Sequence, residues 1–183
     1  MIKEGQIVEI LATSEIYRKP KPDFSSKKEE LFWEIENRKY SLFDGLLLAG
    51  HFGLSQFQLG QRKGINFGGK KEPLYVIAKD EADNRLFVGA GKSHPGLFAK
   101  VFRFQKNNVH PTSEFNFDEN SLEDGISVEI SSPSFETKTE AMFYQFDNDI
   151  FLEFKHPISI TLENHPIEIF YQNQLIEKII LTK

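Results

Sequence analysis

The sequence predicts a mainly β protein: a small β-rich domain, then a small antiparallel β-barrel, with one helix inserted near the N-terminus. Three observations support this fold class. The residues of 150–155 and of 167–171 alternate in the two-residue period of half-buried strands. The apolar runs 74–79 and 85–88 flank a polar turn, which predicts a hairpin. The segment 27–39 carries apolar residues at helical spacing.

The first domain is expected to span residues 1–104. Within it, 3–10 is predicted to form a strand. Residues 44–59 are predicted to form a hairpin that turns near Gly50. The segment 96–104 is predicted to form a further strand that leads out of the domain.

Residues 11–43 are interpreted as an insertion into this first domain. Two Lys-Pro pairs at 19–22 block regular structure, and Ser25 or Ser26 can then cap the helix predicted over 27–39. Two interpretations of the helix stay open. It is either a decoration docked on the barrel or a docking element for a partner.

The acidic C-terminal part is predicted to contain a linker and a barrel. Residues 105–125 are polar and include an acidic run, which is typical of a linker. Residues 126–183 show several short strands, with turn residues at 147–148 and 172–173. Strands at this spacing predict a small barrel or sandwich, and we expect a β-barrel.

Composition and length exclude several classes of protein. The 183 residues suffice for one medium domain or two small ones. No apolar run approaches the roughly 18 residues of a membrane helix, and the first residues lack the layout of a signal peptide. We therefore expect a cytoplasmic protein without a membrane partner. The absence of cysteine excludes disulfides, zinc–thiolate sites and cysteine nucleophiles from this sequence.

The net charge of −5 conceals an uneven distribution of charged residues. Residues 1–50 are nearly neutral, with eight Lys and Arg against nine Asp and Glu. Residues 51–103 carry nine basic against four acidic side chains, whereas 104–183 carry five against fourteen. Only the middle segment therefore has an electrostatic case for binding nucleic acid.

The strongest functional signal is a glycine-rich basic loop that follows the apolar run 54–59. Glycines stand at positions 60, 64, 68 and 69 of this loop. Glycine lets the backbone turn sharply and approach a partner closely, and arginine and lysine supply donors for phosphate oxygens. Two interpretations are a polyanion contact and a solvated turn, and we favour the contact. The predicted RNA-binding residues are His51, Gln61, Arg62, Lys63, Lys70 and Lys71, although a structural hydrogen bond is the alternative role for His51.

Other candidate sites are weaker, and no catalytic residue, metal site or cofactor is predicted. The run Gly89-Ala-Gly-Lys-Ser93 resembles the end of a P-loop, but Leu86 stands where the first glycine is needed. Pro95 also follows where a helix must begin. Four of the five histidines precede proline, and their spacing supports no shared metal site.

The basic loop also carries a resemblance to a known family, the bacterial tRNA 2-thiouridylases (MnmA or TrmU). Their central domain contains the pattern D-G-x-x-x-x-x-H-x-G-L-x-x-Y-T-I-G-Q-R-K-G-L-x-x-G-G. The residues here that fall in register with it are Asp44-Gly45, His51, Gly53-Leu54, Leu59-Gly60-Gln61-Arg62-Lys63-Gly64 and Gly68-Gly69. The downstream matches are Glu72-Pro73, Tyr75-Val76, Asp80, Asn84 and Val88-Gly89. Over 44–104 the chain thus resembles the thiouridylase central domain, and the family also ends in a small β-barrel.

The resemblance implies tRNA as a partner, and tRNA-uridine 2-sulfurtransferase as the family activity. The family uses an N-terminal ATP-pyrophosphatase domain with an S-G-G-x-D-S loop, and two cysteines that relay sulfur. This sequence contains neither. We therefore expect a non-catalytic tRNA-binding or accessory protein related to wobble-uridine 2-thiolation, which works with a separate catalytic subunit. The alternative is a protein–protein interaction module that has lost RNA binding.

Overall fold

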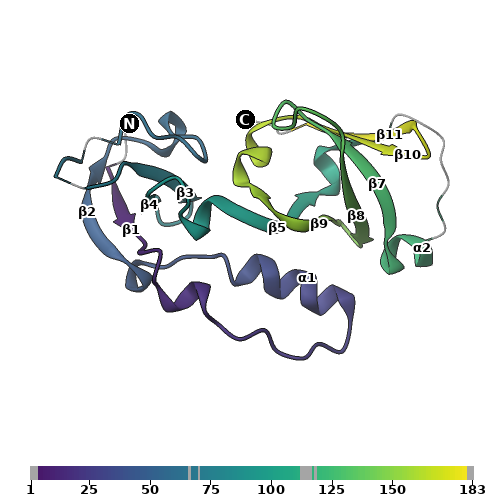
Figure 1. The fold of residues 1–183 in the computed structure, drawn as a ribbon, viewed down its shortest axis with the longest axis horizontal. Helices are drawn as coiled ribbons and strands as arrows, with labels where there is room; N and C mark the ends of the chain where they lie inside the picture. Colours follow the sequence, from purple (N-terminus) through teal and green to yellow (C-terminus); the bar gives the residue numbers. More distant parts are fainter. Residues whose placement is uncertain (1–3, 66, 70, 112–116, 118, 181–183) are drawn as a thin grey trace. The chain divides into compact units, whose positions relative to one another are not determined.

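The computed structural model describes residues 4–65, 67–69, 71–111, 117 and 119–180. By its internal contacts the chain divides into two units (Figure 1). The first unit comprises Met1–Pro22 and Asn37–Phe98, and the second comprises Asp23–Glu36 and Ala99–Lys183. The prediction of a mainly β protein is confirmed, because each unit is built on one sheet. The expected domain boundaries at 104 and 125 stay a prediction, which this grouping does not test.

The first unit contains a four-stranded sheet in the order β2-β1-β4-β3. Strand β1 pairs antiparallel with β2 and parallel with β4, so it lies inside the sheet. The hairpin predicted over 74–88 is confirmed as β3 and β4. The strands are β1 (Gly5–Glu9), β2 (Leu46–His51), β3 (Leu74–Asp80) and β4 (Arg85–Ala90).

The hairpin predicted over 44–59 is wrong. Strand β2 pairs with β1 instead, and Leu54–Gln56 forms the 3-10 helix η3. The chain turns at Gly53, whose φ of 131° is readily accessible only to glycine. Leu54 and Phe57 are then both buried in the core of the first unit, at the three-residue spacing of a 3-10 turn. That spacing, rather than alternation, explains the apolar pattern.

A buried histidine fixes the segment that follows β4. The N–H of Gly96 donates to Nδ1 of His94 at 3.1 Å, so Nε2 carries the proton of the neutral ring and donates to the Ile10 carbonyl at 2.9 Å. Gly89 lies against the ring, where a Cβ would come within 2.5 Å of Cγ of His94. Burial lowers the pKa of His94, which keeps the ring neutral.

The second unit contains a seven-stranded sheet that curls into a half-barrel, in the order β5-β9-β8-β7-β10-β11-β6 (Figure 1). The predicted turns are confirmed by left-handed backbone at Asp147, Gln172 and Asn173. Within the segment expected to be a linker, the short helix α2 (Glu119–Asp124) and one strand are formed. The strands are β5 (Phe98–Gln105), β6 (Val109–Pro111), β7 (Ile126–Ser131), β8 (Thr139–Phe146), β9 (Asp149–Ser159), β10 (Ile167–Tyr171) and β11 (Gln174–Ile179).

The predicted helix is confirmed as α1 (Lys27–Glu36), and it packs on the sheet of the second unit. Leu31 of α1 is fully buried there, in one cluster with Tyr144 and Phe151. Lys27 donates to the carboxylate of Glu153 at 2.9 Å. These contacts agree with a helix docked on the barrel.

One carboxylate oxygen of β11 is buried without a hydrogen-bond partner. Among the described residues, Oε2 of Glu177 has no hydrogen-bond partner. Burial raises the pKa of Glu177 from 4.5 to about 7, while nearby Lys106 opposes the shift. A folded-state pKa above the unfolded value means that the protonated carboxyl stabilises the fold. That contribution is complete below pH 4.5 and is lost as the pH rises through 7.

Replacing Glu177 by Gln should therefore stabilise the protein above neutral pH. We expect the free energy of unfolding of Glu177→Gln at pH 8 to exceed the wild-type value by on the order of 2 kcal/mol. The gain should vanish at pH 4. Urea denaturation at both pH values measures it, with exposed Glu136→Gln as the matched control. Equal stabilities at pH 8 would contradict the assignment.

Acid should weaken the first unit through His94. A depressed folded-state pKa means that the neutral ring contributes stability above the unfolded value of 6.5, and loses it as the pH falls through the folded pKa. We expect the stability difference between wild type and His94→Gln to narrow as the pH is lowered from 7.5 to 5. Guanidinium denaturation at each pH measures this difference. The control is His156→Gln, which changes an exposed histidine, and its stability should depend on pH as that of the wild type does. If the stability difference between wild type and His94→Gln does not change with pH, the mechanism is excluded.

Candidate nucleic-acid interface

The basic loop is anchored on strand β3. The N–H of Gly60 donates to the Val76 carbonyl at 2.8 Å, and the N–H of Val76 donates to the Gln61 carbonyl at 2.9 Å. Three glycines of the loop have left-handed backbone. The φ angle is 75° at Gly60, 87° at Gly64 and 85° at Gly69. The glycines therefore allow the loop to leave the strand and turn without steric strain.

Gln61 braces the loop from inside. Its Oε1 accepts from the N–H of Gln58 at 2.9 Å, and its Nε2 donates to the Lys63 carbonyl at 2.7 Å. Apolar side chains hold the same segment against the core of the first unit, namely Leu59, Ile65 and Phe67. The side-chain amide of Gln61 and the packed apolar residues thus fix the loop. The charged side chains of the loop take no part in this packing.

Three predicted cations of the loop are exposed: Arg62, Lys63 and Lys71. Across the described part of the chain, none of the three forms an ion pair with a carboxylate. Lys70, which was predicted beside them, lies outside the described residues. An exposed cation without an internal partner keeps its donors available for an external anion.

His51 is placed differently from these cations. It is only 3% exposed, and its Nδ1 accepts from the N–H of Gly53 at 3.1 Å. Its Nε2 lies 3.3 Å from the Asn84 carbonyl oxygen, and its ring packs edge-on against Phe57. The structural hydrogen bond considered for this residue is therefore present. In this arrangement His51 positions the start of the loop, while the side chain itself does not reach the surface.

The division into two units sharpens the charge asymmetry. The first unit has thirteen Lys and Arg against eight Asp and Glu, a surplus of five positive charges. The second unit has nine against nineteen, a surplus of ten negative charges, because the acidic α1 segment belongs to it. A polyanion is consequently attracted by the unit that carries the loop and repelled by the other.

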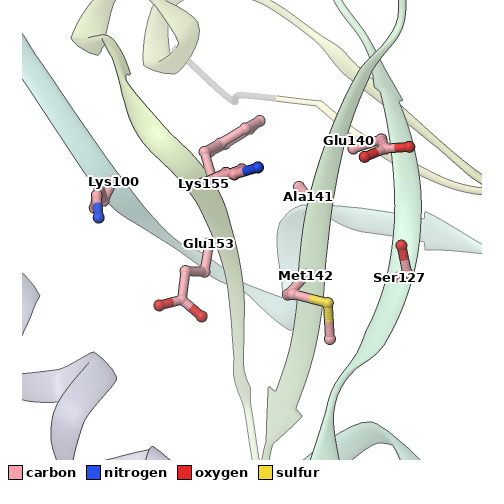
Figure 2. A pocket seen from close by; sticks show the side chains of 8 residues that line it. Lys100, Ser127, Glu140, Ala141, Met142, Glu153 and Lys155 are labelled. Atoms are coloured by element: carbon pink, nitrogen blue, oxygen red, sulfur yellow. The ribbon is translucent and has the colours of Figure 1, made fainter.

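A groove on the second unit differs in charge from the loop. It has a volume of about 300 Å³ and lies on the β5-β9-β8-β7 part of the sheet. Figure 2 shows Lys100 and Lys155 on one side of Met142, and the carboxylates of Glu140 and Glu153 nearby. Two cations and two anions balance, so this groove offers no net attraction for phosphate.

The remaining candidates have structural explanations. In the P-loop-like run, the N–H of Gly91 donates to the Pro73 carbonyl at 2.9 Å, and only the three-residue 3-10 helix η4 (Pro95–Leu97) follows. Among the residues that the structure describes, no three His, Cys, Asp or Glu side chains form a group that could hold a metal ion. The described helices include none that is long and apolar enough to cross a bilayer.

The sequence analysis missed a second cationic feature of the first unit. A cavity is lined by Arg38 and Lys39 on one segment and by Lys79 on β3. These cations are about forty positions apart in the sequence. No local spacing could have joined them, because the fold alone brings the two segments together.

Comparisons of this chain with known proteins all find proteins that act on tRNA by name. A model described as the tRNA methyl transferase PRC-barrel domain matches residues 35–90. The tRNA-specific 2-thiouridylase MnmA of Karelsulcia muelleri is 36% identical over 155 residues, which cover 85% of this chain and 37% of the relative. The proteins of the same name from Flavobacterium johnsoniae and Christiangramia forsetii are 32% and 31% identical, over 95% and 93% of this chain and 44% and 42% of their own lengths.

The chain therefore spans less than half the length of these curated relatives. The similarity nevertheless runs through both units, and the family model covers the basic loop. The chain is thus homologous to the central and C-terminal domains of the tRNA-specific 2-thiouridylase (MnmA) family.

Proposed function

We propose that this chain is a tRNA-binding accessory protein of wobble-uridine 2-thiolation, and that it is not catalytic by itself. The observation that carries the proposal is the basic loop, which exposes Arg62, Lys63 and Lys71. Backbone hydrogen bonds anchor this loop on β3, in the unit that has a surplus of positive charge. The relatives named tRNA-specific 2-thiouridylase support tRNA as the polyanion.

In this proposal the loop grips the phosphate backbone and does not read bases. Contacts from Arg and Lys side chains to phosphates position an RNA and carry no sequence information of their own. Arg62 and Lys63 lie between Gly60 and Gly64, and Lys71 stands two residues after Gly69, so each of these cations lies within two residues of a glycine. A close approach of the RNA backbone is thereby sterically permitted. The acidic second unit would favour orientations in which tRNA meets the first unit.

The chemistry of thiolation would reside on another polypeptide segment. The relay of sulfur in the resembled family needs cysteines, and this sequence has none. We therefore propose that a catalytic thiouridylase subunit adenylates and thiolates the uridine, while this chain holds the tRNA.

A second candidate function is supported by the apolar edge of the first sheet. Strand β2 is an edge strand, and Leu46 and Leu47 on it are 55% and 59% exposed. Phe43 and Phe52, which flank the strand, are 96% and 68% exposed. Exposed apolar residues on an edge strand mark a surface for another polypeptide. The alternative is accordingly a protein–protein interaction module that has lost RNA binding.

Removal of two loop cations should weaken tRNA binding. For Arg62→Ala/Lys63→Ala we expect an affinity for tRNA lower by on the order of tenfold at low salt. The slope of log affinity against log salt should fall by about 0.7 to 0.9 for each lost phosphate contact. Gel shift over a series of KCl concentrations measures both quantities.

The matched control for charge is Lys100→Ala/Lys155→Ala, which removes two exposed lysines from the charge-balanced groove. It should bind tRNA as the wild type does. An unchanged affinity of the loop variant would remove the loop from the proposal. If the wild-type protein binds no tRNA even at low salt, the interaction-module alternative is favoured.

Co-purification from the native host separates the apolar edge from the basic loop. We expect Leu47→Asp, which places a charge on the exposed edge strand, to abolish capture of a protein partner while nucleic acid remains bound. Arg62→Ala/Lys63→Ala should have the reverse effect. Absorbance at 260 nm and mass spectrometry of the eluate measure the two components. If each variant loses both the nucleic acid and the protein partner, the edge strand and the loop are not independent binding surfaces.

A further inference from the structure

The exit of the basic loop carries an exposed carboxylate, that of Glu72, next to two exposed lysines. Glu72 precedes Pro73, and the residue before a proline is restricted to extended backbone. Its carboxylate lies against Gly91, where a Cβ would come within 2.5 Å of Oε2. The loop exit and the turn that follows β4 are therefore in direct contact. Lys71 precedes Glu72 and Lys92 follows Gly91, so one lysine stands beside each partner of this contact.

Backbone hydrogen bonds fix the turn that carries Lys92. The N–H of Gly91 donates to the Pro73 carbonyl at 2.9 Å, and the N–H of His94 donates to the Gly91 carbonyl at 3.2 Å. His94 is 2% exposed and its ring is hydrogen-bonded at both nitrogens, so the turn ends in the core of the unit. Lys71 stands two residues before Pro73, and two residues of chain span at most about 7 Å. Both lysines are therefore confined to the same end of the β3–β4 hairpin.

The three charged side chains at this end are accessible to a ligand. Lys71, Glu72 and Lys92 are all exposed. Within the part of the chain that the structure describes, none of them forms an ion pair or a side-chain hydrogen bond. Two cations against one anion leave one net positive charge, which attracts phosphate. The carboxylate has acceptors only, so it needs a donor group on the ligand.

An RNA backbone supplies both kinds of group that these side chains bind. Phosphate oxygens accept hydrogen bonds from lysine ammonium groups. Each ribose also carries a 2′-hydroxyl, which can donate to a carboxylate and by which a protein distinguishes RNA from DNA. A DNA backbone offers the phosphates without the hydroxyl, and a carboxylate beside it would meet only negative charge. A carboxylate next to two lysines therefore favours RNA over DNA.

We propose that Glu72 accepts a hydrogen bond from a ribose 2′-hydroxyl of bound RNA, while Lys71 and Lys92 contact adjacent phosphates. Glu72 can take this role only if the polyanion is RNA, so the assignment rests on the proposed function. It adds Glu72 and Lys92 to the interface and gives the interface a means to select RNA. The Gly-Lys-Ser run at 91–93, which is no P-loop, thereby acquires a role in phosphate binding.

An RNA that lacks the 2′-hydroxyl donor tests the role of Glu72. The probes are an RNA stem-loop and the same stem-loop with 2′-fluoro groups, which keep the RNA conformation but cannot donate. The ratio of the two affinities should be on the order of tenfold larger in wild type than in Glu72→Ala, because a hydrogen bond to a charged acceptor is lost. The affinity of Glu72→Ala for the 2′-fluoro form should rise, because a repelling carboxylate is removed. Gel shift at low salt measures all four affinities.

The matched control is Glu15→Ala, which removes another exposed carboxylate from the first unit. It should keep the wild-type ratio, and circular dichroism verifies that each variant is folded. If Glu72→Ala raises the affinity for both probes by the same factor, the carboxylate only repels phosphate and the assignment is overturned. An unchanged pair of affinities overturns it as well.

The salt dependence of binding tests the role of Lys92. In Lys92→Ala the slope of log affinity against log salt should fall by about 0.7 to 0.9, as expected for one lost phosphate contact. The ratio between the hydroxyl and fluoro probes should stay at the wild-type value, because the carboxylate is intact. Lys155→Ala in the second unit is the control and should keep the wild-type slope. An unchanged slope in Lys92→Ala would remove this lysine from the interface.

Failure of this assignment can be told apart from failure of the proposed function. If tRNA binding depends on Arg62 and Lys63 but the probe ratio does not change in Glu72→Ala, only the role of Glu72 is lost. If the wild-type protein binds no tRNA at low salt, both fail.

Discussion

The architecture of the first unit depends on the position of β1 inside its sheet. This strand pairs with β2 on one side and with β4 on the other, although β4 begins about eighty residues later. The carbonyl of Ile10, just beyond β1, is fixed by the buried ring of His94, and that of Asn84, just before β4, lies beside His51. These contacts hold β4 in place, and β4 in turn holds β3. The loop and the cavity inherit their geometry from that strand.

Charge is distributed unequally between the two units. The positive surplus, the glycine loop and the cationic cavity all belong to the first unit, whereas the second unit carries a surplus of ten negative charges. Exposed charges act over about one Debye length, roughly 8 Å at physiological salt. The positive charges of the first unit attract a polyanion, whereas the negative charges of the second unit repel it.

Local signals were sufficient for part of this structure. The β3–β4 hairpin, helix α1 and the turn at Asp147 were predicted because turn residues and helical spacing act within a few positions. The parallel pairing of β1 with β4 has no local signal, and the run after Gly53 was misread because Leu54 and Phe57 are buried from a 3-10 turn. The loop cations were selected from composition and resemblance, and their role in RNA binding stays a prediction. The cavity around Lys79 was not predicted, because only tertiary structure brings its two segments together.

The central claim is that RNA phosphates meet the cations of the glycine loop. Chemical labelling of lysine side chains in the wild-type protein, with and without tRNA, tests it most directly. The account predicts that tRNA lowers the reactivity of Lys63 and Lys71, while Lys100 and Lys155 of the second unit react as before. Protection confined to the second unit, or no protection at saturating tRNA, would contradict it.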